Sequence, residues 1–191
     1  MALLTFKRRD FPRVAAKAAL GLALLAAAAS AVRAQGSSLE YAVKANYLYK
    51  FAPFVEWPTQ TFDAPNSPFA VCVSGQDPFG DTLDTAVRGQ TVGGRPVVVR
   101  RLAVVPDRPP CQVLYLGRSR NQSPASILAL TRGEPVLTVT DQDQGSSGGI
   151  VQFVLRDGRV RFALDVARAR AAGMTLSSKL QTLAVSLKGG S

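Results

Sequence analysis

The chain has 191 residues, 47% of them hydrophobic and 19% charged, so it can bury a core of its own and is neither disordered nor fibrous. It contains no histidine and only two cysteines, which removes the commonest general base and excludes a zinc site built from these residues. Half of the +10 formal charge lies in residues 1–34, and the rest carries no nucleic-acid motif or basic stripe, so no nucleic-acid partner is predicted.

Residues 1–34 have the organisation of an export signal. A basic segment with two adjacent arginines, residues 7–17, precedes an alanine-rich run over residues 18–31, and small residues suited to cleavage end at Ala34. The apolar run is shorter than the roughly 20 residues that span a bilayer. We therefore predict a signal peptide cleaved near Ala34, export by the Sec or the twin-arginine route, and a periplasmic mature chain without a transmembrane anchor.

The mature chain, residues 35–191, is expected to form one α/β domain. Helical spacing of apolar residues predicts a first helix over residues 38–52, ended by Pro53. Strands are predicted at Phe69–Ser74, Arg95–Leu102, Cys111–Leu116 and Val136–Thr140, with helices from Asp77 to Val87 and from Ser123 to Gly133. This alternation is typical of βαβ units in a mostly parallel, doubly wound sheet with helices on both faces.

The pattern changes after residue 149. Asp157-Gly158 lies between two apolar runs, Ile150–Leu155 and Arg159–Leu164, which predicts an antiparallel hairpin. A short helix capped by Asp165 should follow, and apolar positions between Leu176 and Leu187 predict a final helix. The expected fold is therefore a doubly wound sheet with a C-terminal antiparallel hairpin followed by helices.

The two cysteines fall in predicted strands. In a sheet of order 2-1-3-4, the strands of Cys72 and Cys111 are neighbours, and parallel neighbours lie about 5 Å apart, within reach of a disulfide. An exported chain with an even number of cysteines favours a disulfide. The alternative is two buried free thiols that act as small hydrophobic side chains.

Three predicted strands end at residues suited to ligand binding. Gly75, Gly117 and Asp141 fall at carboxyl ends of strands, where open α/β sheets bind ligands, and Arg118 could hold an anion there. The alternative is a set of ordinary loop turns with a solvated arginine. Asp141 and Asp143 could form a carboxylate pair for a cation or for acid/base chemistry, but a third ligand is missing, so we predict no metal. Without histidine we also predict no catalytic residue and no cofactor, and hence no enzyme.

Aromatic residues are concentrated between Tyr41 and Trp57. Tyr47 and Phe51 fit a helix face packed on the sheet, whereas Tyr49 lies on a second apolar face. This second face could pack within the chain or contact a partner. Tyr49, Phe54 and Trp57 are therefore the candidate partner-binding residues.

Several segments resemble the YfiR family of periplasmic regulators. They are Lys44–Pro58, Cys72–Gly80, Gly94–Val97, Cys111 with Leu114–Leu116, Leu137–Asp141, Gly148–Phe153, Val160–Phe162 and Ala172–Leu180. The likeness extends over residues 40–187 in order and is far more specific than any single motif. The chain departs from the family at Pro53, where a basic residue is frequent, and it lacks the second cysteine pair that some members carry between Asp141 and Phe153.

The resemblance implies a non-enzymatic periplasmic homodimer that represses a membrane-bound diguanylate cyclase by binding its periplasmic region. Such a repressor lowers cyclic di-GMP and biofilm formation, and an OmpA-type outer-membrane lipoprotein can sequester it. The alternative is a periplasmic sensor module that binds a small ligand, either a nucleotide or an aromatic metabolite.

Overall fold

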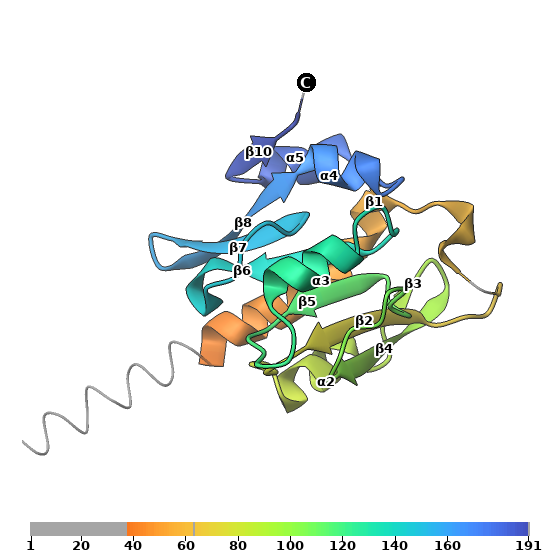
Figure 1. Cartoon of the computed structure of the whole chain (residues 1–191), viewed down its shortest axis with the longest axis horizontal. Coiled ribbons are helices and arrows are strands. Elements are labelled where there is room, and N and C mark those ends of the chain that lie inside the picture. Colours follow the sequence, from red (N-terminus) through yellow and green to blue (C-terminus); the bar gives the residue numbers. More distant parts are fainter. Residues whose placement is uncertain (1–37, 63, 191) are drawn as a thin grey trace, which may run out of the picture. The chain divides into compact units, whose positions relative to one another are not determined.

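A computed structural model describes residues 38–62 and 64–190, and residues from Glu40 onward form one compact unit (Figure 1). The predicted signal peptide lies outside the described residues. Within the described part of the chain, no helix is both long enough and apolar enough to cross a membrane.

An eight-stranded sheet organises this unit, with the strand order β10-β8-β7-β6-β5-β2-β4-β3. Its strands are β2 (Phe69–Ser74), β3 (Thr91–Val92), β4 (Arg95–Leu102), β5 (Val113–Leu116), β6 (Leu137–Asp141), β7 (Val151–Arg156), β8 (Arg159–Asp165) and β10 (Ser186–Lys188). Neighbours pair in parallel except at β3–β4 and β7–β8, which are antiparallel. A second sheet pairs β1 (Val55–Glu56) with β9 (Thr175–Leu176).

The helices are short apart from the first, which covers residues 38–50 and is called the N-terminal helix below. The others are η1 (Ala52–Phe54), η2 (Thr59–Thr61), α2 (Asp81–Val87), α3 (Pro124–Leu130), η3 (Gln142–Gln144), α4 (Val166–Ala171) and α5 (Ser178–Leu183). The mixed α/β class and the antiparallel hairpin at β7–β8 confirm the predicted fold. The order β4-β2-β5-β6 is the expected 2-1-3-4 arrangement.

Every residue of β2, β5 and β6 is buried, so other side chains cover both faces of the sheet at these strands. On one face, Val71 and Tyr115 belong to a large core with the N-terminal helix and α2. On the other face, Cys72 and Leu114 form a smaller core with α3. As expected, Tyr47 and Phe51 pack on the sheet, and the Phe51 ring meets the edge of Phe162 at 5.1 Å between centroids.

Two predicted helix boundaries were wrong. Asp77 does not cap a helix, because its carboxylate accepts hydrogen bonds from the backbone N–H groups of Phe79 (2.7 Å) and Gly80 (3.2 Å) and forms a turn, and α2 begins at Asp81. The final helix ends at Leu183, and Ser186–Lys188 instead extends the sheet beside β8. The backbone of this segment pairs with the otherwise free edge of β8, and the spacing of apolar residues that predicted a helix gives no information about such pairing.

The turn between β7 and β8 agrees with its sequence. Asp157 and Gly158 both have positive φ, 51° and 68°, as a type I′ hairpin turn requires. This turn makes β7 and β8 antiparallel neighbours, and their register pairs Arg156 with Arg159 next to the turn.

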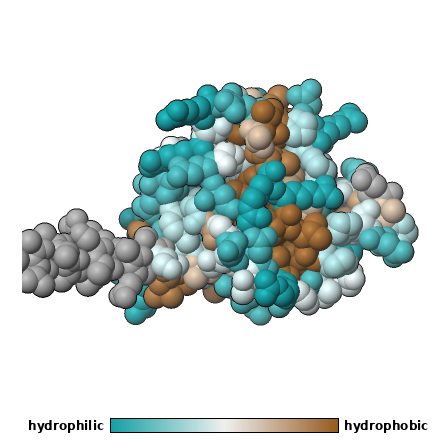
Figure 2. Space-filling model, turned by 90° about the horizontal axis from the view of Figure 1, so that it is seen from below, coloured by the Kyte–Doolittle hydropathy of each residue, from teal (hydrophilic) through white to brown (hydrophobic). Residues whose placement is uncertain are grey.

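The outer surface is not uniformly polar. Figure 2 shows hydrophobic side chains gathered between hydrophilic ones on the face that lies below in Figure 1, the side of α2 and β4.

Candidate functional site

The residues expected at the carboxyl ends of the strands do come together. Gly75 follows β2 and Gly117 follows β5, and the Gln76 N–H donates to the carbonyl of Arg118 at 2.7 Å. A Cβ atom added to Gly75 would lie 2.4 Å from the Arg118 oxygen, and one added to Gly117 would lie 2.2 Å from the Gln76 oxygen. Both positions therefore need glycine, because the two loops pack directly on each other.

Arg118 lies beside these glycines with its side chain exposed. Its Nε donates to the carbonyl of Gln144 at 3.0 Å, so one edge of the guanidinium holds the η3 loop. Asp141 ends β6 and is fully buried. The four candidate crevice residues thus lie at one edge of the sheet, with the glycines and Asp141 engaged in packing and hydrogen bonds.

Asp141 is the centre of a buried ionic cluster. Its Oδ2 accepts hydrogen bonds from Lys44 Nζ at 2.7 Å and from the Tyr115 hydroxyl at 3.2 Å. Its Oδ1 accepts from the backbone N–H of Asp143 at 3.2 Å and caps η3. The Lys44 side chain has no solvent exposure and also pairs with Glu40, while Asp143 lies 3.6 Å away. These five residues are called the Lys44 cluster below.

The charge states in the cluster follow from burial and contact. Burial alone would lower the pKa of Lys44, but its hydrogen bonds to Asp141 and Glu40 outweigh this effect and raise the pKa. Burial raises the pKa of Tyr115, and the nearby negative charge of Asp141 raises it further. Lys44 therefore stays an ammonium and Tyr115 a neutral hydroxyl donor, so both stabilise the charge of Asp141.

Aromatic rings enclose this cluster. Phe79 meets Tyr115 edge-on at 4.7 Å and Tyr41 at 5.8 Å between ring centroids. Lys44 Nζ lies 5.2 Å from the Tyr41 ring centroid, in the geometry of a cation–π contact, and the Tyr41 hydroxyl accepts from Gln144. Burial raises the pKa of Tyr41 despite that hydrogen bond. In the part of the chain that the structure describes, no group of carboxylate or thiol ligands could hold a metal ion.

The cluster joins the N-terminal helix to the sheet. Lys44 and Asp141 are 97 positions apart in sequence, so their ion pair fixes where the helix lies across the strands. Sequence reasoning did not single out Lys44, because lysine on a helix is ordinarily solvated. The spacing nevertheless places Lys44 on the buried face of the helix, because Tyr41, three residues before it, and Leu48, four residues after it, lie on that packed face.

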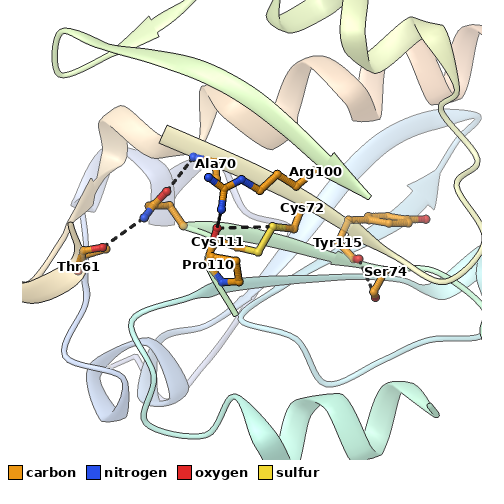
Figure 3. Close-up of a disulfide and its surroundings, with 9 residues drawn as sticks. Thr61, Ala70, Cys72, Ser74, Arg100, Pro110, Cys111 and Tyr115 are labelled. Atoms are coloured by element: carbon orange, nitrogen blue, oxygen red, sulfur yellow. Dashed lines mark hydrogen bonds between the residues drawn. A yellow bond between two sulfur atoms is a disulfide. The ribbon is translucent and has the colours of Figure 1, made fainter. Parts of the chain in front are cut away.

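The predicted disulfide joins Cys72 to Cys111, with the two Cα atoms 5.8 Å apart (Figure 3). The alternative of two free thiols does not describe this structure. Beside it, Arg100 Nη1 donates to the Pro110 carbonyl at 3.0 Å. The Gln112 side chain accepts from the Ala70 N–H at 2.7 Å and donates to the Thr61 carbonyl at 3.2 Å. The disulfide and these hydrogen bonds anchor the segment before β5 to β2.

The candidate partner-binding residues differ in exposure. Tyr49 is only 8% exposed and belongs to the large core, so packing within the chain describes its position. Phe54 and Trp57 are half-buried. Trp57 packs edge-on against Phe69 at 5.7 Å, and Lys179 Nζ lies 5.8 Å from the centroid of the Phe54 ring. Phe54 and Trp57 are thus the members of this set that present side-chain surface to solvent.

Comparison with known proteins gives one informative result. The sequence model described as YfiR/HmsC-like matches residues 41–185, which includes nearly all of the described unit. No curated protein matches the chain significantly.

Proposed function

Because the chain belongs to the YfiR/HmsC-like family, we propose that it represses an inner-membrane diguanylate cyclase by binding the periplasmic region of that enzyme. Members of this family are periplasmic regulators in cyclic di-GMP signalling and not enzymes. The observation that carries the proposal is the family match over residues 41–185. Binding of the repressor lowers cyclic di-GMP and, through it, biofilm formation.

The proposed place of action is the periplasm. The predicted signal peptide precedes the matched segment and would be removed near Ala34. The Cys72–Cys111 disulfide supports this location, because disulfides persist in the oxidising periplasm and are rare in the cytosol.

We assign the cyclase contact to the Phe54 surface, defined as Phe54, Trp57 and Lys179. The Phe54 carbonyl accepts from the Ser177 N–H at 2.9 Å, and β1 pairs with β9 directly beyond it. These bonds hold the aromatic side chain on a fixed backbone, which limits the entropy lost on binding. Lys179 adds a positive charge beside the ring, so the surface suits an apolar partner residue flanked by a carboxylate.

The Phe54→Ala substitution is expected to weaken binding to the cyclase periplasmic region at least thirtyfold. Truncating an interface aromatic costs about 2 kcal/mol or more, which corresponds to that loss. Isothermal titration with the periplasmic region of a membrane-bound diguanylate cyclase from the same organism measures the effect, and thermal unfolding checks that the fold is intact.

Leu155→Ala is the matched control, because Leu155 is also a partly exposed apolar residue but lies on β7. Its affinity should equal that of the wild type. Equal affinities for all three proteins would remove the Phe54 surface from the proposal.

Two further contacts belong to the proposed function. A homodimer would cover apolar surface such as the hydrophobic strip in Figure 2, since such patches on soluble domains mark protein contacts. An OmpA-type outer-membrane lipoprotein that competes for the repressor would release the cyclase.

A further inference from the structure

A cavity of about 540 Å³ lies at the amino ends of β2, β5 and β6. It therefore opens at the opposite edge of the sheet from the Lys44 cluster. Its lining includes Pro68 before β2, Cys111 before β5 and Val136 before β6. The volume falls within the range of about 300 to 1,000 Å³ that is typical of small-molecule sites.

Two walls of this cavity are held in place by a disulfide and by hydrogen bonds. The Cys72–Cys111 disulfide, which Figure 3 shows, holds one wall against β2, and the buried Gln112 side chain adds a hydrogen bond to the Ala70 N–H. Arg95 Nη1 donates to the carbonyls of Ala64 (2.9 Å) and Ser67 (2.7 Å) and so holds the loop that forms another wall. A preformed cavity loses little conformational entropy when it binds a ligand.

The charge of the lining favours an anion. Arg100 and Arg108 supply two guanidinium groups, against the single carboxylate of Glu134. Arg100 donates from Nη1 to Pro110, whereas Arg108 is exposed and forms no ion pair with an acidic residue in the described segments. A guanidinium presents paired N–H donors that match a carboxylate or a phosphate.

The rest of the lining combines apolar and polar side chains. Phe62, Val136 and several prolines supply rigid hydrophobic surface around the arginines. One side of the Phe62 ring is covered by Arg95, whose guanidinium carbon lies 3.9 Å from the ring centroid and fixes the ring in place. A ligand for such a cavity needs an anionic group and an apolar or aromatic body.

We propose that this cavity binds a small organic anion, whose carboxylate or phosphate contacts Arg108 and Arg100 while its apolar part lies against Phe62 and Pro110. The site goes beyond the proposed repressor function, because it requires neither the cyclase nor the Phe54 surface. It lies at the edge of the sheet opposite to the crevice that sequence reasoning had indicated.

The test titrates the purified protein with phenyl phosphate, benzoate and uncharged benzyl alcohol, and follows backbone amide shifts by NMR. At least one anion should bind saturably and shift the backbone amide signals of Arg108, Cys111, Gln112, Glu134 and Val136, and benzyl alcohol should bind at least tenfold more weakly. Saturation by phenyl phosphate alone assigns a phosphate ligand, and saturation by benzoate alone assigns a carboxylate.

The Arg108→Ala variant should lower the affinity for the preferred anion about tenfold, and Arg108→Lys should lower it less. Arg132→Ala is the matched control, because Arg132 is exposed but lies outside the lining, and it should bind as the wild type does. The proposal is overturned if neither anion saturates at concentrations of tens of millimolar, or if Arg108→Ala and wild type bind equally well.

Discussion

Replacing Lys44 with methionine is expected to lower the free energy of unfolding by about 3 to 5 kcal/mol. The substitution keeps most of the side-chain volume but removes the ammonium that pairs with Asp141 at 2.7 Å. Because neither side chain is exposed, the remaining carboxylate would be a buried charge with only the Tyr115 hydroxyl and a backbone N–H as hydrogen-bond donors. Urea denaturation measures the loss, with the slope of the unfolding transition checked for two-state behaviour.

Two further variants separate charge from packing. Lys50→Met is the matched control, since Lys50 is exposed on the same helix, and it should change stability by no more than about 0.5 kcal/mol. Adding Asp141→Asn to Lys44→Met should restore part of the lost stability, because the unpaired charge is then gone. A loss below about 1 kcal/mol for Lys44→Met would contradict the account of the Lys44 cluster as the link between helix and sheet.

Replacing both cysteines with alanine is expected to cost about 3 to 4 kcal/mol of unfolding free energy. Cys72 and Cys111 are 39 residues apart, and a cross-link that closes such a loop restricts the unfolded chain by about this amount. Alanine is preferable to serine because both positions are buried, where a hydroxyl without a partner would add its own cost.

Chemical denaturation of the oxidised wild type and of the Cys72→Ala, Cys111→Ala variant measures this difference. A reducing agent serves as the internal control: it should lower the stability of the wild type and leave the variant unchanged. A reductant effect of equal size on both proteins, or a difference below about 1 kcal/mol between them, would contradict a stabilising disulfide.

Local sequence signals predicted much of the fold because they coincide with the tertiary contacts. β2 and β4 have the predicted bounds, and the disulfide follows from the predicted order of strands. The predicted helix boundaries were wrong where a residue or segment forms hydrogen bonds other than those of the expected helix. Asp77 forms a turn with the Phe79 N–H, and the segment around Leu187 uses the edge of β8 in place of another helical turn.

The sites were harder to predict because they depend on distant pairing. The sequence indicated that Gly75, Gly117 and Asp141 would meet, but Asp141 is paired with a lysine 97 positions away. The cavity beside the disulfide depends on side chains such as Arg100, Arg108 and Glu134, which are brought together only by the order of the strands. No periodicity or short motif in the chain encodes that juxtaposition.

The most direct test of the proposed repressor function is the cellular concentration of cyclic di-GMP in a strain that lacks this gene but expresses a membrane-bound diguanylate cyclase with a periplasmic region. Deletion should raise cyclic di-GMP, and the wild-type gene should return it to the starting level. Complementation with Phe54→Ala should fail, although the variant protein accumulates in the periplasm, and complementation with Leu155→Ala should succeed. An unchanged cyclic di-GMP concentration in the deletion strain, with the cyclase present, would contradict the proposed function.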